Sequence, residues 1–280
     1  MNYAQLVTLR SVCRRMGALR CVRWKAELRS ARRRREYASV ARSSVAIVVA
    51  GVTPRILVSD AYEYARARSW EDDAHLLRAL SSRVTAGTAC WDIGANVGVY
   101  TLVMALRAGA SGAVVSFEPE PRSNARLCEN IHFNNLANVA VFQYALGDTK
   151  GPVALSVSEH PSAGTHSLVA QAPEGSQREE AIFVQVLPGD EIVAAHALPI
   201  PAVVKIDVEG AEERVIAGMV RTLGDPRCST VLCEMHFGIL EAQGQAGAPA
   251  RIARRLEECG FNRLEWLDRS HLFAVKERAA

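Results

Sequence analysis

Three charged residues lie within five positions of the stretch VVKIDVEGAEERVI, which covers residues 203–216. Lys205, Asp207 and Glu209 follow a β-branched apolar run, and Gly210 leads into a helical pattern. The apolar run predicts a buried strand, and folding does not require charges at its carboxyl end. In open α/β sheets that end is where ligands bind. We therefore interpret Asp207 and Glu209 as candidates to orient a hydroxyl group, accept its proton or hold a cation.

Glu234 and His236 follow the apolar run of the next predicted strand, whose carboxyl end should lie beside that of the first. Histidine titrates near neutral pH, so His236 is the candidate catalytic base. The alternative is that Glu234 and His236 form a structural hydrogen-bonded pair. Together with Asp207 and Glu209 they could gather Mg²⁺ or Mn²⁺. The spacing does not require an ion, so we predict a catalytic site without a metal.

A second candidate site lies in the segment TACWDIGANVGVYTLVMA, where an apolar strand ends in Asp92. Gly94, Asn96 and Gly98 then form a tight loop that leads into a helix. A dinucleotide site would show G-x-G-x-x-G and place a pyrophosphate on the helix N-terminus. The carboxylate of Asp92 would repel a pyrophosphate. The same carboxylate suits a ligand that carries a positively charged amino group or sulfonium, and S-adenosylmethionine carries both.

Glu118 lies 26 residues after Asp92, at the end of the following predicted strand, within SFEPEP. A carboxylate at that place can accept hydrogen bonds from both hydroxyls of a ribose. Asp148, in the segment ALGD after the third strand, lies where an adenine would bind, or it is a plain turn residue. These residues complete the predicted cofactor site.

The elements that must position these residues alternate between strand and helix from about residue 55 onward. Predicted strands cover residues 88–93, 113–117, 139–145, 203–206, 230–234, 263–267 and 272–275, and residues 153–157 and 182–186 flank a polar loop. Predicted helices cover residues 70–83, 97–108, 122–134, a segment that ends near 222, and 249–259. The alternation predicts an α/β fold whose sheet is mostly parallel, with helices on both faces and an antiparallel hairpin at the C-terminal edge.

We assign no role in binding or catalysis to two further sets of side chains. His160 and His166 lie in the polar loop, where histidines are more typical of solvated positions than of substrate contacts. Trp70, Trp91 and Trp266 are interpreted as core or lid packing rather than as a platform for a cofactor.

The motifs DIGANVGVYT, FEPEPRSNARLCENIHFNN, ALGD, VQVLPGDEI, KIDVEGAE and LCEMHF occur in this order. In that order they resemble the FkbM family of S-adenosylmethionine-dependent methyltransferases, over about residues 55–275. The resemblance implies a class I, Rossmann-like fold and methylation of a hydroxyl on a sugar, glycan or natural product. Pro188-Gly189 departs from the family pattern and leaves the role of Asp190 unassigned. We expect a methyltransferase domain over residues 51–280 and a basic, partly helical extension over residues 1–50.

The positive charge of the chain is concentrated in its first 36 residues. Residues 1–36 hold eleven Lys and Arg against two Glu, a net charge of +9, whereas the whole chain carries +3 and the remainder therefore −6. We interpret this arm as solvated, with weak contact to an anionic membrane surface as the alternative.

The seven cysteines form no C-x-x-C pair, and we see no secretory signal or membrane-spanning run, which favours the reducing cytoplasm.

Three other functions make different predictions. An NAD-dependent oxidoreductase predicts a third glycine in the first loop and a cradle for pyrophosphate, and Asp92 argues against both. A non-catalytic binding protein on a methyltransferase fold predicts salt-sensitive binding through the basic arm. A site that has lost its catalytic function is not expected to retain acidic residues at the strand ends, which argues against this function. A nucleic-acid methyltransferase predicts a stacking motif such as N-P-P-Y, which the chain lacks. We expect a small-molecule or glycan acceptor and no nucleic acid.

Overall fold

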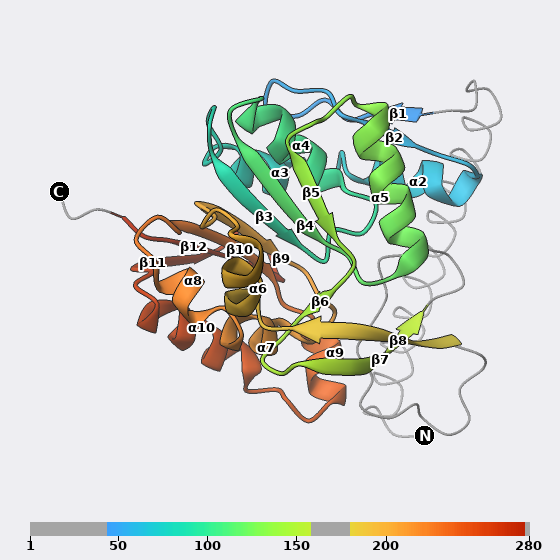
Figure 1. Ribbon diagram of the computed structural model, residues 1–280. Helices are drawn as coiled ribbons and strands as arrows, with labels where there is room; N and C mark the ends of the chain where they lie inside the picture. Colours follow the sequence, from blue (N-terminus) through green and yellow to red (C-terminus); the bar gives the residue numbers. More distant parts are fainter. Residues whose placement is uncertain (1–43, 158–179, 278–280) are drawn as a thin grey trace, which may run out of the picture.

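The computed structural model describes residues 44–157 and 180–277 (Figure 1). The predicted basic extension up to residue 43 lies outside these residues, as do both loop histidines, His160 and His166. None of the helices in the described ranges is long and apolar enough to cross a membrane.

A seven-stranded sheet forms the centre of the molecule. In spatial order its strands are β11 (Arg263–Trp266), β12 (His271–Val275), β10 (Thr230–Glu234), β9 (Val203–Ile206), β3 (Ala89–Ile93), β4 (Ala113–Phe117) and β5 (Val139–Phe142). The neighbours from β10 to β5 pair in parallel, whereas β12 pairs antiparallel to both β10 and β11. The predicted parallel sheet with an antiparallel C-terminal edge hairpin is confirmed.

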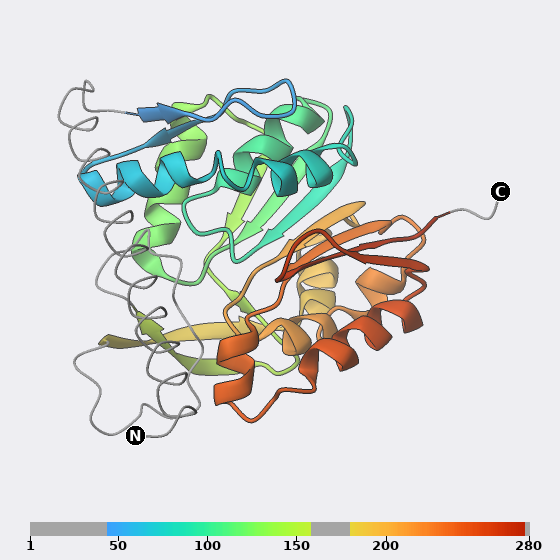
Figure 2. The same ribbon diagram turned by 180° about the vertical axis from the view of Figure 1, so that it is seen from behind.

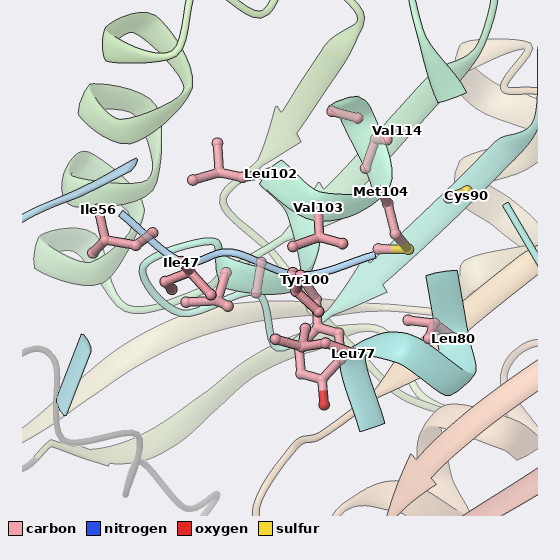
Figure 3. Packing of buried hydrophobic residues seen from close by; sticks show 14 of the residues in the cluster. Ile47, Ile56, Leu77, Leu80, Cys90, Tyr100, Leu102, Val103, Met104 and Val114 are labelled. Atoms are coloured by element: carbon pink, nitrogen blue, oxygen red, sulfur yellow. The ribbon is translucent and has the colours of Figure 1, made fainter. Parts of the chain in front are cut away.

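Helices cover both faces of this sheet (Figures 1 and 2). One face packs against α2 (Ala61–Ser69), α3 (Ala74–Ser81), α4 (Val99–Ala108) and α5 (Pro121–Phe133), and the other against α6 (Gly189–His196), α7 (Glu212–Ala217), α8 (Val220–Gly224) and α10 (Ala248–Glu258). Side chains alternate between the faces along each strand. Cys90 therefore belongs to the first core, which Figure 3 shows, and Trp91 to the second, as its predicted packing role requires.

The predicted strand over residues 139–145 is divided in the structure. The chain leaves the central sheet after Phe142, and β6 (Ala145–Leu146) pairs instead with β8 (Glu180–Leu187), which also pairs with β7 (Gly151–Val157). Figure 1 shows this small sheet beside the carboxyl ends of β4 and β5. It forms a wall at the edge where the sequence predicts ligand binding.

The predicted helices differ from the observed ones where backbone segments approach each other. The helix expected to end near residue 222 is split into α7 and α8 at Gly218, where a Cβ would lie 1.8 Å from the carbonyl oxygen of Gly147. The helix predicted over residues 70–83 is limited to α3, and α2 precedes it. The short helices α6 and α9 (Phe237–Ala242) were not predicted, because they are too short for a clear period.

A hairpin of β1 (Ser44–Ala46) and β2 (Arg55–Leu57) precedes the central sheet and packs on its first core. Asn130 of α5 accepts a hydrogen bond from the backbone N–H of Leu57, and Asn134, the residue that caps the C-terminal end of α5, accepts one from that of Arg55, each at 2.8 Å. The boundary predicted at residue 50 therefore falls in the turn of a hairpin that is fixed to the body.

Candidate active site

An open cleft lies at the carboxyl ends of β3, β4 and β9, with about 580 Å³ of space that includes open solvent. Its walls include Gly94 and Asn96 after β3, Glu118 after β4, and Asp207 and Glu209 after β9. The small sheet closes one side through residues 144–146 and 155. Because the chain runs from β3 to β4 on one side while β9 flanks β3 on the other, this is the switch point at which open α/β sheets bind ligands.

The loop after β3 is held by backbone contacts that require glycine. The N–H groups of Gly94 and Ala95 both donate to the carbonyl oxygen of Phe117, at 3.0 Å. Gly94 has φ +76°, and a Cβ on it would lie 1.8 Å from the carbonyl oxygen of Asp207. Gly98 has φ +94°, and a Cβ there would lie 2.4 Å from Leu127 Cδ1. Both predicted glycines therefore serve close packing as well as the loop conformation.

Glu118 presents a buried carboxylate beside this loop. Its Oε2 accepts a hydrogen bond from the N–H of Asn96 at 2.7 Å, and its Oε1 accepts one from the N–H of Glu120 at 2.9 Å. Burial raises the pKa of Glu118 to about 7, although these two N–H groups act in the opposite direction. Asn96 Oδ1 is buried and has no hydrogen-bond partner among the residues that the structure describes. This cradle fits a ligand that carries several hydroxyl or amino donors.

Asp92 lies beneath the loop rather than in the cleft wall. It is fully buried, it accepts a hydrogen bond from Thr101 Oγ1 at 2.6 Å, and its other oxygen lies 3.4 Å from Lys205 Nζ. Lys205 also donates to the carbonyl oxygen of Gly94 at 2.7 Å and lies 3.2 Å from Asp207 Oδ2. A direct contact between Asp92 and a cofactor stays a prediction. In the structure its carboxylate takes part in a buried ion-pair network that joins β3 to β9.

Lys205 stays charged in this network. Burial lowers its pKa, but the neighbouring charges of Asp207 and Asp92 raise it further, so the net shift is upward. The pKa of Asp207 is lowered, because the effect of burial is outweighed by Lys205 and by His236. One lysine therefore pairs with two carboxylates, that of Asp92 beneath the loop and that of Asp207 in the cleft wall, and it keeps Asp207 ionised. Sequence spacing placed Lys205 at the strand end but did not show this bridge.

The structure brings together the four residues predicted for the acceptor side. His236 Nε2 lies 3.5 Å from Glu209 Oε2, 3.6 Å from Asp207 Oδ1 and 3.9 Å from Glu234 Oε1. Glu234 also lies 3.3 Å from His271 Nε2, so it is shared between two imidazoles. Glu209 adopts a left-handed backbone with φ +47°, a strained conformation for a side chain of this size. Asp207 and Glu209 face the cleft, and His236 and Glu234 stand behind them.

Glu212 was missed from the sequence, although it lies inside the motif KIDVEGAE. It is fully buried at the start of α7, and its Oε1 lies 2.6 Å from His236 Nδ1 and accepts the N–H of Gly210. Burial lowers the pKa of His236, but Glu212 and the carboxylates around Nε2 raise it to about 9. A ring that is protonated at neutral pH does not take a proton from an acceptor. The role of His236 as a base stays a prediction that this charge state does not favour.

Two other predicted residues lie at the edges of the site. Asp148 is not among the described residues that line the cleft, and its carboxylate pairs with Arg214 Nε at 2.9 Å, so a contact with adenine stays a prediction. Trp266 is 48% exposed rather than buried, and its ring lies 5.8 Å from that of Phe237, which is 45% exposed. This exposed aromatic pair begins at the residue after His236.

The comparisons with known proteins agree with the motifs. The model of the methyltransferase FkbM domain matches residues 92–263. The hexuronic acid methyltransferase AglP of Haloferax volcanii is 30% identical over 71% of this chain and 77% of its own length. The 31-O-demethyl-FK506 methyltransferase FkbM of Streptomyces tacrolimicus is 28% identical over 54% of this chain and 66% of its own. A solved FkbM methyltransferase from Methylobacillus flagellatus aligns with a TM-score of 0.46 and 12% identity; the alignment covers 76% of this chain and only 54% of that structure.

Proposed function

Because this chain belongs to the FkbM methyltransferase family, we propose that it transfers a methyl group from S-adenosylmethionine to a hydroxyl oxygen of a sugar, glycan or natural product. One observation carries the proposal. The loop with Gly94 and Asn96, the carboxylate of Glu118 and the acidic end of β9 line a single cleft. A donor on the first wall would therefore meet an acceptor on the second.

The residues on the donor side fit the chemistry of S-adenosylmethionine. Glu118 would accept hydrogen bonds from the ribose hydroxyls, and the orphaned Asn96 Oδ1 would accept one more from the ligand. When bound, the cofactor supplies an activated methyl group, so the protein has mainly to align donor and acceptor and exclude water.

A sugar acceptor is supported by two independent observations. The name of one relative says that it methylates a hexuronic acid, and the name of the other places the methyl group on an oxygen. Phe237, the residue after His236, forms an exposed aromatic pair with Trp266. Sugar rings carry apolar C–H faces that pack on aromatic rings, while their hydroxyls seek polar partners such as Glu209.

Calorimetric titration tests the cofactor assignment. S-adenosylmethionine and NAD are titrated separately into the wild type, Glu118→Gln and the matched control Glu257→Gln, which changes an exposed glutamate on α10. We expect micromolar binding of S-adenosylmethionine alone to the wild type and to the control, and at least about tenfold weaker binding to Glu118→Gln. A folded wild type that binds NAD, or neither ligand, contradicts the proposal.

The acceptor class is tested with a panel of hexuronic acids, neutral hexoses and macrolide alcohols. Each is incubated with the protein and with S-adenosylmethionine labelled in its methyl group, and the products are separated and analysed by mass spectrometry. We expect label on an oxygen of at least one hydroxylated acceptor. Label found only on nitrogen or carbon overturns the assignment to oxygen.

A further inference from the structure

We propose that Asp207, Glu209 and His236 bind one divalent cation of the Mn²⁺ or Mg²⁺ class at the wall of the cleft. Each residue offers one ligand atom, and these atoms all lie within 4.8 Å of one another. Two carboxylate oxygens and one imidazole nitrogen form a donor set that Mn²⁺ accepts, because it binds both oxygen and nitrogen ligands. The cation would take the place of the proton on Nε2 of His236, so its binding would release that proton. Binding of the cation goes beyond the proposed function and does not depend on it.

The separations of the donor atoms fit a shared ion. His236 Nε2 is 3.5 Å from Glu209 Oε2 and 3.6 Å from Asp207 Oδ1. Bonds of about 2.1 Å to a common ion place neighbouring donors about 3.0 to 3.5 Å apart, depending on the geometry. Small side-chain movements would therefore complete the site. The remaining positions of the ion would face the cleft, which Asp207 and Glu209 line.

The support behind His236 is the second observation. Glu212 Oε1 contacts Nδ1 of the ring at 2.6 Å, so the other ring nitrogen, Nε2, points to the two carboxylates. In metal sites a ligating histidine usually donates its second N–H to a carboxylate or carbonyl, which fixes the tautomer and the ring orientation. Glu212 is fully buried, and its Oε2 has no hydrogen-bond partner in the part of the chain that the structure describes. Burying a carboxylate with an unpaired oxygen costs free energy. A role in orienting a metal ligand would explain why Glu212 occupies this position.

The balance of charge around the cluster also favours a cation. The carboxylates gathered here are Asp92, Asp207, Glu209, Glu212 and Glu234. His271 lies 3.3 Å from Glu234 and offsets part of this charge when its ring is protonated. Lys205 is the nearby lysine, and it contacts Oδ2 of Asp207. The other oxygen, Oδ1, is the one that faces His236. Lysine and cation would therefore use different oxygens of Asp207, and the cation would offset charge that Lys205 does not reach.

A cation at this place would polarise an oxygen of the acceptor and make loss of its proton easier. This catalytic role rests on the proposed function. No protein base would then have to take the proton directly. Water or hydroxide in the cleft could accept it.

Manganese binding provides the test. Wild type is freed of metal with a chelator, the chelator is removed, and MnCl₂ is titrated while the electron paramagnetic resonance signal of free Mn²⁺ is followed. Asp207→Asn, Glu209→Gln and Glu212→Gln are compared with the control Glu257→Gln, and circular dichroism checks that each is folded. We expect one site per chain, binding weakened at least tenfold in the two ligand variants, and binding weakened about 10- to 100-fold in Glu212→Gln. Competition by MgCl₂ should displace Mn²⁺.

The outcomes are distinct from those for methyl transfer. No saturable Mn²⁺ binding by folded wild type, or binding that all three variants retain, overturns the site. Binding of Zn²⁺ without binding of Mn²⁺ overturns the assigned class of cation. S-adenosylmethionine is titrated into the same metal-free protein. Cofactor binding without cation binding refutes this inference alone, and cation binding without cofactor binding refutes the proposed function alone.

Discussion

Gly94 and Asp207 meet backbone to backbone at the centre of the site, where a Cβ on Gly94 would lie 1.8 Å from the carbonyl oxygen of Asp207. The loop of the proposed cofactor site therefore rests directly on the acidic end of β9. Lys205 strengthens this contact, because it donates to the carbonyl of Gly94 and pairs with Asp207. Direct contacts therefore hold the proposed donor and acceptor sides together, and no flexible linker separates them.

Gly94→Ala should therefore disrupt both sides at once. We expect a loss of at least about 3 kcal/mol in the free energy of unfolding, because backbone must move and the residue has a left-handed φ. Gly51→Ala is the matched control, since Gly51 has φ +78°, close to that of Gly94, but a Cβ on it would meet no described atom within 4 Å. It should cost only about 1 kcal/mol. Urea unfolding measures both, and equal losses would show that conformation, and not the contact with Asp207, is what requires glycine.

Cofactor affinity should depend on pH through Glu118. Its pKa is raised to about 7 by burial, so the carboxylate is protonated below that pH and ionised above it. Only the ionised form can accept hydrogen bonds from both ribose hydroxyls. The Kd for S-adenosylmethionine should therefore rise as the pH falls through 7, by up to about tenfold for each further pH unit.

Glu118→Gln provides the control for this pH dependence. Glu209 has a pKa near 7 as well, raised chiefly by burial, and it lines the same cleft. Calorimetry across this pH range should show a flatter profile for Glu118→Gln than for the wild type. An unchanged profile would assign the dependence to Glu209 or another group.

Lys205→Met should destabilise the protein by about 3 to 5 kcal/mol, because it leaves the buried carboxylate of Asp92 without a counter-charge. The double variant Lys205→Met with Asp92→Asn should recover part of this loss, since the uncompensated charge is then gone. Lys150→Met changes an exposed lysine 3.8 Å from Glu191 and should cost less than about 0.5 kcal/mol. Urea unfolding is also measured for Asp92→Asn alone. If the losses caused by Lys205→Met and by Asp92→Asn add up to the loss in the double variant, the two side chains are not coupled and their ion pair has no stabilising role.

Trp266→Ala and Phe237→Ala should weaken acceptor binding and leave the cofactor site intact. We expect the KM for a sugar acceptor to rise about tenfold, with little change in kcat or in the Kd of S-adenosylmethionine, because the pair lies outside the cleft. Phe133→Ala is the control, since it removes another partly exposed aromatic ring, at the C-terminal end of α5. A fall in kcat at unchanged KM would instead indicate that the rings position reacting groups.

Sequence patterns determined much of this protein, because its strands are short, apolar and ended by turn residues. Those patterns placed β3, β4, β9 and β10 within a residue or so of their observed bounds. They also identified the charged strand ends, because ligands bind at the carboxyl ends of parallel strands. Parallel pairing then brings Asp207, Glu209 and His236 to one edge of the sheet.

Tertiary structure decided which atoms meet. Glu212 lies on a helix that packs against the end of β10, so its contact with His236 joins residues 24 positions apart and leaves no periodic signal. Asp92 and Lys205 pair across neighbouring strands, so burial and pairing together turned a predicted ligand contact into a support beneath the loop. Local spacing fixes the direction of a side chain along its own element. Distance, burial and charge state depend on how elements far apart in the sequence pack.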